Sequence, residues 1–231
     1  MAANAELADR GAYLPEADAL VCADLHLGRD ATANVELPLG EQERLPERLS
    51  ALVARFEPAE VVLAGDLLDA FNRVPEEAAR ALRAVENTIA SADAEVVVVE
   101  GNHDSLLDDV VSGPVHSEYR LRDGTLVSHG HEHPDGEADL HVIGHDHPAI
   151  EIEQRRQPCY LFGPEQYRGG DLLVLPAFNQ LAPGTVVNGA TAADRPSPMI
   201  EQLGRFRPAV WDPDADETLW FPALDGLQAM L

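Results

Sequence analysis

Lysine is absent from this chain of 231 residues, in which all 16 basic residues are arginine and 41 residues are acidic. The formal net charge of −25 disfavours nucleic acid and anionic membranes as partners at ordinary ionic strength, because like charges repel. At molar salt the Debye length falls to about 3 Å, and such a charge becomes tolerable. The composition therefore predicts a halophilic source, with an ordinary acidic cytosolic protein as the alternative.

Cysteine and long apolar runs are also scarce. Cys22 and Cys159 are too few for a disulfide framework in a chain of this size. No stretch approaches the roughly 18 apolar residues that span a membrane, and residues 1–20 lack the pattern of a signal peptide. We therefore expect a cytoplasmic protein with no membrane association. The apolar content of 45% predicts a globular fold, and the lack of repeats or of a clear boundary favours one domain over residues 1–231.

Strands and helices alternate in the first half of the chain. Apolar runs predict buried strands at 19–23, 61–64 and 96–99, the last consisting of four consecutive valines. Between them, apolar residues at helical spacing predict amphipathic helices at 41–57 and 75–91. This alternation predicts an α/β fold in which the first strands are parallel.

The residues after 104 predict a second sheet. Strands at 115–122 and 125–128 flank Asp123-Gly124, a dipeptide typical of hairpin turns. Residues 182–208, rich in proline, glycine, alanine and threonine, are predicted to form a surface loop. Further strands of the second sheet are predicted at 140–143, 149–153 and 172–175.

Metal-binding side chains follow five of these predicted strands. A single histidine after a strand is more often structural than a ligand, but the same event at strand after strand makes independent structural roles implausible. In open α/β sheets, functional groups collect at the carboxyl ends of the strands. The five groups are Asp24 with His26, Asp66 with Asp69, Asn102 with His103, His129 alone, and His145 with His147.

The ordered blocks D-x-H, G-D-x-x-D, G-N-H-D, H-G and G-H-x-H span residues 24–147. This set resembles the calcineurin-like metallophosphoesterase superfamily. The resemblance implies a four-layer α/β/β/α sandwich, in which two facing mixed sheets are flanked by helices. It also implies a metal-dependent phosphoric ester hydrolase with two divalent metal ions.

The resemblance assigns a role to each residue of the five blocks. His103 would not bind metal but would face the scissile phosphate, oriented by Asp69. His131 is an outer-site candidate, and His133 is expected to be an ordinary surface residue. One metal ion would be held by Asp24, His26, Asp66 and His147, and the other by Asp66, Asn102, His129 and His145, so that Asp66 bridges both.

The chemistry of phosphate esters suits such a site. Two cations about 3.5–4 Å apart neutralise the anionic ester, lower the pKa of a bridging water and clamp the attacking and leaving oxygens. Carboxylate, amide and imidazole ligands without thiolate favour a transition metal, with Mn expected and Fe, Zn or Co as alternatives. They disfavour calcium and a structural zinc site. His103 can stabilise the charge of the transition state or protonate the leaving oxygen.

A narrower resemblance involves residues 24–28, 144–150 and Leu175-Pro176-Ala177-Phe178-Asn179, which are similar to those of the ICC-like phosphoesterases. That branch is related to DNA ligase-associated and repair-exonuclease-related groups. It implies a phosphodiesterase acting on nucleotides or nucleic-acid ends, with DNA repair or processing proteins as partners. Residues 175–179 can equally be a strand end that closes the second sheet.

Three functions remain open from the sequence. The first is the phosphodiesterase, although long duplex DNA is a doubtful substrate because the chain shows no basic stripe and has no room for a DNA-capping domain. The second is a phosphomonoesterase acting on a small phosphorylated metabolite. The third is a non-catalytic metal-binding scaffold, which would be expected to lack ligands or His103.

Overall fold

The computed structural model describes residues 4–28, 41–69, 73–182, 184–188 and 197–227. Its first sheet has six strands in chain order, of which the first three are antiparallel and β3 to β6 are parallel. Within the described ranges no helix is long and apolar enough to cross a bilayer. The strands are β1 (Glu6–Ala8), β2 (Gly11–Leu14), β3 (Ala19–Cys22), β4 (Glu60–Ala64), β5 (Glu95–Val99) and β6 (Val115–His116).

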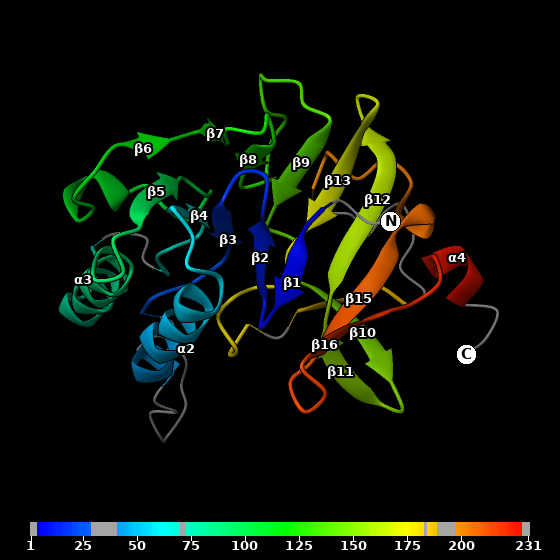
Figure 1. Ribbon diagram of the computed structural model, residues 1–231, viewed down its shortest axis with the longest axis horizontal. Coiled ribbons are helices and arrows are strands. Elements are labelled where there is room, and N and C mark those ends of the chain that lie inside the picture. Colours follow the sequence, from blue (N-terminus) through cyan, green and yellow to red (C-terminus); the bar gives the residue numbers. More distant parts are fainter. Residues whose placement is uncertain (1–3, 29–40, 70–72, 183, 189–196, 228–231) are drawn as a thin grey trace.

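Two helices lie together on one face of this sheet (Figure 1). They are α2 (Glu41–Phe56) and α3 (Glu76–Ala90), each within two residues of its predicted bounds. Pro75 precedes the first turn of α3, where its fixed φ is tolerated. The predicted apolar faces are buried against the sheet, because residues spaced three and four apart share one side of a helix. They include Leu45, Leu49, Leu52 and Val53 of α2, and Ala78, Leu82, Val85 and Ile89 of α3.

The second sheet has seven strands in the order β16-β15-β12-β13-β9-β8-β7, of which β8, β9 and β13 are parallel to one another. A separate three-stranded sheet has the order β11-β10-β14. The strands of the second sheet are β7 (Glu118–Arg120), β8 (Leu126–Ser128), β9 (Leu140–Ile143), β12 (Tyr160–Tyr167), β13 (Gly170–Val174), β15 (Arg207–Asp212) and β16 (Glu217–Trp220). Those of the small sheet are β10 (Pro148–Ile152), β11 (Arg155–Pro158) and β14 (Thr185–Val186).

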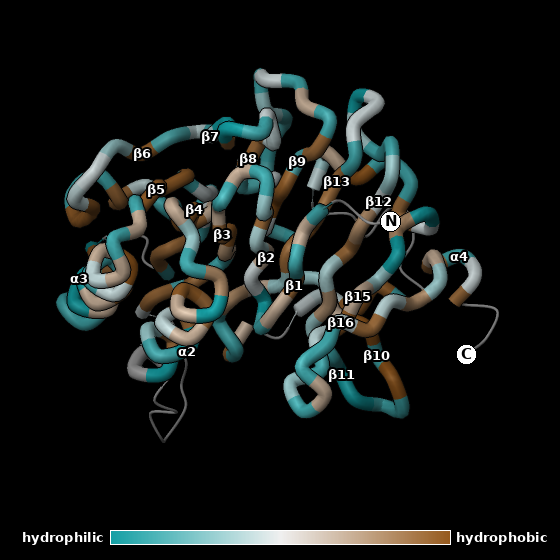
Figure 2. The backbone as a smooth tube through the Cα atoms, viewed as in Figure 1, coloured by the Kyte–Doolittle hydropathy of each residue, from teal (hydrophilic) through white to brown (hydrophobic). Residues whose placement is uncertain are grey.

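The two large sheets face each other across a shared apolar core. Val62 and Val97 of the first sheet belong to the same buried cluster as Val142 and Leu173 of the second. Figure 2 shows the hydrophobic residues concentrated in these central strands. The predicted α/β sandwich of two facing mixed sheets with outer helices is confirmed. Its fourth layer is thin and includes the 3-10 turn η3 (Leu203–Arg205), the short helix α4 (Leu224–Leu227) and the buried residues Met199 and Ile200.

The predicted hairpin strand at 115–122 is wrong as a single element. Residues 115–116 form β6 and pair with β5 in the first sheet, whereas Glu118–Arg120 pair with β8 in the second. The chain crosses between the sheets at Ser117, and a local pattern of apolar residues cannot show which neighbour each half will find. A short 3-10 turn, η1 (Leu107–Asp109), precedes the crossing.

Two further predictions need correction. The strand predicted at 149–153 is β10, which pairs in the small sheet and not in the second sheet. Residues 182–208 are not simply a surface loop, because Val187, Met199 and Phe206 are buried against the outer face of the second sheet. Part of that segment, at 183 and 189–196, lies outside the described residues.

Candidate metal centre

Candidate ligands from both large sheets meet where the parallel strands end. The loops after β3 and β4 remain paired beyond the strands, since the His26 amide donates to the Asp66 carbonyl at 2.8 Å. Gly144, after β9, donates its amide to the His129 carbonyl, after β8, at 3.1 Å. The His145 amide then donates to the Asp24 carboxylate at 3.0 Å and joins the loops of the two sheets. This linkage brings the predicted ligands of the two sheets to one site.

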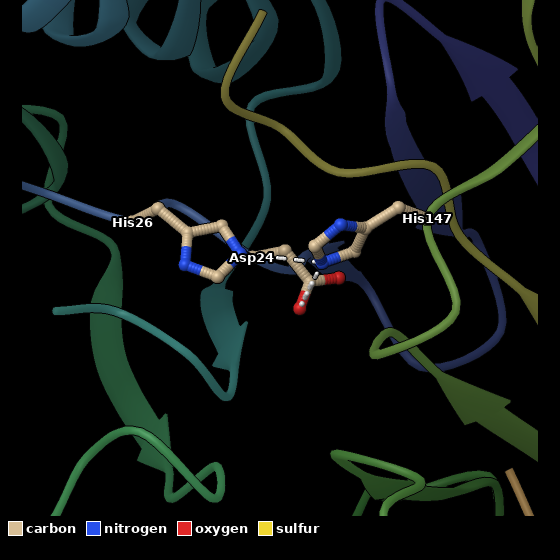
Figure 3. A group of neighbouring side chains, drawn as sticks. All are labelled: Asp24, His26 and His147. Carbon is tan, nitrogen blue, oxygen red and sulfur yellow. Dashed lines mark hydrogen bonds and ion pairs between the residues drawn. The ribbon is translucent and has the colours of Figure 1, made fainter. Parts of the chain in front are cut away.

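Asp24, His26 and His147 form the first cluster of ligand atoms (Figure 3). The His147 Nε2 atom lies 3.1 Å from Asp24 Oδ1 and 3.2 Å from His26 Nε2. Asp24 and His26 are buried, and His147 is partly exposed. The three side chains therefore converge on one point with a carboxylate at its base.

The spacing of the imidazoles fits a metal ion. Metal–nitrogen bonds of about 2.1 Å to two atoms 3.2 Å apart enclose an angle of about 100°, which tetrahedral and octahedral centres accommodate. The ligand set contains carboxylates and imidazoles but no thiolate, because both cysteines are buried apolar residues in other parts of the core. The residues present therefore fit a divalent transition-metal ion.

Asp24, Asp66 and His129 form the second cluster. His129 Nε2 lies 3.4 Å from Asp66 Oδ1 and 3.2 Å from both Asn102 Oδ1 and His145 Nδ1. Asn102 and His145 thus adjoin this cluster, as the resemblance implies. The carboxylate common to the two clusters is Asp24, whereas the bridging role assigned to Asp66 stays a prediction.

The backbone of the candidate ligands is strained. A positive φ is uncommon for any residue other than glycine, costs about 1–3 kcal/mol, and persists only where the surroundings hold it. Such strain clusters at functional sites and is consistent with ligands held in place before an ion binds. Five candidate ligands have this conformation: Asp24 (φ 59°), His26 (43°), Asp66 (49°), His145 (68°) and His147 (43°).

Two glycines allow the loops to approach this closely. A Cβ atom on Gly144 would lie 2.5 Å from Asp24 Oδ2, and one on Gly65 would overlap the His129 ring. Gly65 also has a φ of 81°, which disfavours any other residue. The glycine that precedes a ligand in these motifs is therefore required for space around the neighbouring ligand.

The electrostatics favour cation binding. Burial opposes ionisation of Asp66, but the hydrogen bond and charge of His129 hold its pKa well below the usual range. Burial alone would lower the pKa of His129, yet the bond with Asp66 and the charges of Asp24 and Asp66 raise it to about 9. Burial and the charge of His129 lower the pKa of His145 to about 4. In the metal-free protein one proton on His129 thus partly balances the carboxylates.

His103 lies at the open side of the centre. Its side chain is 34% exposed, its Nε2 atom is 4.0 Å from Asp66 Oδ2, and its ring meets His26 edge-on with centroids 6.2 Å apart. The Asp69 amide donates to the Leu27 carbonyl at 3.0 Å, which places Asp69 in the loop after β4. The orienting role of Asp69 stays a prediction.

Asp104 supports the loops of the candidate centre, and the sequence reasoning left it without a role. Its buried carboxylate accepts hydrogen bonds from the amides of Gly101 (2.9 Å), Leu68 (3.0 Å) and Leu67 (3.2 Å). It therefore ties the loop that carries His103 to the loop that carries Asp66. Its place directly after His103 in the G-N-H-D block was the available signal.

The match to a family model covers residues 18–174, and the model describes the calcineurin-like phosphoesterases. The chain belongs to this family. This calcineurin-like phosphoesterase is a metal-dependent phosphoester hydrolase, as the five sequence blocks predicted.

A solved structure shows the same fold. The nuclease MPE of Pseudomonas putida is 23% identical, with a TM-score of 0.61 over 93% of each chain. YfcE, a phosphoesterase from E. coli, is 16% identical, with a TM-score of 0.45 over 89% of this chain and 98% of its own. A search of the curated proteins found no significant match.

Proposed function

We propose that this phosphoesterase is a phosphodiesterase that hydrolyses the phosphodiesters of nucleotides or nucleic-acid ends. It would use two divalent metal ions, and manganese is the metal we expect. The observation that carries the proposal is the convergence of two facing imidazole pairs, His26 with His147 and His129 with His145, on Asp24 and Asp66. Each pair has the spacing that one metal ion accepts.

The proposed ligands are those that the resemblance assigns. When bound, the two ions would neutralise the ester charge and ease the ionisation of a water molecule between them. The chain itself holds the carboxylates and imidazoles rigidly at the base of the centre and leaves one side open. The ligand sets are Asp24, His26, Asp66 and His147, and Asp66, Asn102, His129 and His145.

His103 is proposed to act on the substrate. Its exposed ring borders the centre, and its amide donates to Asp66 Oδ1 at 3.0 Å, which fixes the backbone beneath it. From this place Nε2 can donate a hydrogen bond to a phosphate oxygen or a proton to the leaving oxygen, whereas Nδ1 is buried. Asp69 would favour the required orientation of the imidazole.

Two considerations support nucleotide diesters or strand ends over long duplexes. A structural neighbour is described as a nuclease, which makes nucleic-acid chemistry a reasonable class for this site. The net charge of −25 and the lack of lysine oppose a long contact track along a polyanion. A strand end reaches the metals without such a track. Partner proteins in DNA repair or processing would then supply the strand end.

A metal and substrate screen tests the proposal. Protein stripped with chelator is reloaded with Mn, Fe, Zn or Co, and kcat/KM is compared for bis-p-nitrophenyl phosphate and p-nitrophenyl phosphate at matched salt. We expect the diester to be preferred and Mn to give the highest rate. Preference for the monoester would instead identify a phosphomonoesterase, and no turnover with any metal would favour the non-catalytic scaffold.

A further inference from the structure

Residues 177–179, which follow β13, run beside the loop that carries Asp24 and His26, and we call them the strap. The Phe178 amide donates to the Ala23 carbonyl at 2.8 Å, and the Asn179 amide donates to the Asp24 carbonyl at 3.2 Å. The strap therefore fixes the backbone of the ligand loop with its amides, and its carbonyls need other partners.

Two arginines donate to all three carbonyls of the strap. Arg10 Nη1 donates to the Ala177 carbonyl at 2.8 Å and to the Asn179 carbonyl at 2.9 Å. Arg48 Nη1 donates to the Phe178 carbonyl at 2.9 Å, and its guanidinium lies over the Phe178 ring, 4.5 Å from the centroid. Hydrogen bonds from a charged donor are roughly twice as strong as neutral ones. The strap is thus held between the two arginines and the ligand loop.

Arg48, a residue of α2, is itself fixed by the turn between β1 and β2. Its Nε and Nη2 atoms donate to the two carboxylate oxygens of Asp9, each at 3.0 Å, and Nη2 also donates to the Asp9 carbonyl at 3.2 Å. This bidentate pair sets the plane of the guanidinium, which the ammonium group of a lysine could not reproduce. Arg48 therefore joins α2 and the adjacent β1–β2 turn (Figure 1) to the strap.

The backbone of the β1–β2 turn favours glycine where Arg10 stands. Asp9 and Arg10 are the two residues of this turn, and both have a positive φ, 37° and 72°. Two-residue hairpin turns of this conformation prefer asparagine or aspartate followed by glycine, which adopts a positive φ without steric cost. Asp9 matches this preference and Arg10 does not. The contacts of the Arg10 side chain with the strap give a reason for an arginine at this position.

We propose that Arg10 and Arg48 are positioning residues of the metal centre, which hold Asp24 and His26 in place through the strap. The inference rests on the proposed function, because it takes Asp24 and His26 to be metal ligands. Both arginines would act through the strap and not on the substrate. Their loss should affect the site of Asp24, His26 and His147 more than the other site.

Metal affinity is the first test, measured by calorimetric titration of Mn into the metal-free protein. A group that contacts a metal ligand is typically worth about 10–100-fold in affinity, and the arginines act one step further away. We therefore expect Arg48→Met to weaken one site about three- to tenfold and the other site less.

Arg55→Met is the matched control, because Arg55 belongs to the same helix, pairs with the Asp216 carboxylate and lies over the rings of Phe56 and Trp211. It removes the same charge and the same kinds of contact, so metal affinity should stay unchanged. No loss of affinity in Arg48→Met, or an equal loss in both variants, would overturn the proposal.

Arg10→Gly separates positioning from folding. Glycine suits the turn, so relief of the backbone strain should offset part of the stability that is lost with the hydrogen bonds. Metal affinity at one site should still fall about three- to tenfold. Gln154→Gly is the control, since Gln154 (φ 63°) is exposed and holds the same second position in the two-residue turn between β10 and β11. Unchanged metal affinity in Arg10→Gly would restrict Arg10 to a structural role and overturn its part in the proposal.

Asp9→Asn tests the link through Arg48. Asparagine also suits the turn but offers one acceptor oxygen, so the bidentate pair is lost and metal affinity should fall less than in Arg48→Met. The double variant Asp9→Asn/Arg48→Met should lose no more affinity than Arg48→Met alone, because residues that act through one another are not additive. Losses that add in full would overturn this link.

Hydrogen exchange on the metal-free protein provides a readout that does not depend on the metal. The amides of Phe178 and Asn179 should exchange faster in Arg48→Met than in the wild type, because their bonds to the ligand loop open more often. Arg55→Met should leave their exchange unchanged. If the wild type binds no metal, the proposed function fails, and exchange still decides whether the arginines hold the strap. Unchanged protection in Arg48→Met would overturn the proposal whatever the metal result.

Discussion

Asn179 donates its side-chain amide to the Leu25 carbonyl at 2.9 Å, across 154 residues of sequence. The same amide reaches the His26 carbonyl at 3.3 Å, and the Asn179 backbone amide donates to the Asp24 carbonyl at 3.2 Å. The residue is buried and follows β13. It therefore holds the turn in which Asp24 and His26 both have a positive φ. The sequence offered a strand end that closes the second sheet as one role of residues 175–179, and it did not foresee this support of the ligand loop by Asn179.

Replacing Asn179 with leucine should weaken metal binding at the cluster of Asp24, His26 and His147. Partners that hold ligands from behind are typically worth about 10–100-fold in metal affinity. Calorimetric titration of metal into the metal-free protein should show that the metal affinity of one site falls more than that of the other. Asn188→Leu is the control, since the hydrogen bonds of Asn188 with other described residues go to the backbone of Glu151. Unchanged affinity at both sites in Asn179→Leu would contradict this role.

Asp66→Asn should weaken both metal sites together if Asp66 bridges them, whereas Asp24→Asn should weaken chiefly one. Elemental analysis after equilibrium dialysis against limiting Mn would measure the stoichiometry of each variant. The opposite pattern would make Asp24 the bridge, as its membership of both clusters allows. Full metal content in both variants would show that neither carboxylate is a ligand.

His103→Ala should retain its metal while losing turnover, because the ring is proposed to act on the substrate and not to bind metal. A positioned acid or hydrogen-bond donor contributes about 10²–10⁴-fold, and a loss in that range is expected. Asp69→Asn should reduce turnover less. His116→Ala, at a half-buried histidine in β6, is the control and should keep its activity. Loss of metal from His103→Ala would make this residue a ligand.

The affinity for metal should rise with pH between about 6.5 and 9, because the pKa of His129 is raised to about 9 in the metal-free fold and its proton must leave before the metal binds. The stability of the metal-free protein should change in the opposite direction. A raised pKa stabilises the fold fully below the unfolded value of about 6.5, and this contribution is lost as the pH rises through 9.

Thermal unfolding with excess chelator and calorimetric titration with Mn would measure the two trends on the same sample. In His129→Gln, residue 129 cannot titrate, so metal affinity and the stability of the metal-free protein should both depend less on pH in this window. A metal affinity that is independent of pH in the wild type would contradict the assignment of His129.

Molar KCl should raise the melting temperature, because screening reduces the self-repulsion of a chain with a net charge of −25. The comparison is made between dilute buffer and rising KCl, with NaCl at the same ionic strength to separate screening from a specific effect of potassium. Equal melting temperatures in dilute buffer and molar KCl would argue against a halophilic origin.

The strands β3, β4 and β5 and the helices α2 and α3 were predictable from the sequence, because their apolar periodicity is local and strong. Strands β1, β2, β12, β15 and β16 were not predicted. They pair with residues that are distant in the sequence or lie toward sheet edges, where the pattern of burial is irregular.

The sequence by itself determined the metal-binding blocks, the family and the class of chemistry, since motif order and ligand type are properties of the chain. Tertiary structure decided which of these groups meet. Asp24 lies 121 residues before His145, and only the facing of the two sheets joins them. The supporting roles of Asp104 and Asn179 also depend on that meeting, because their hydrogen bonds go to backbone groups whose positions no local pattern specifies.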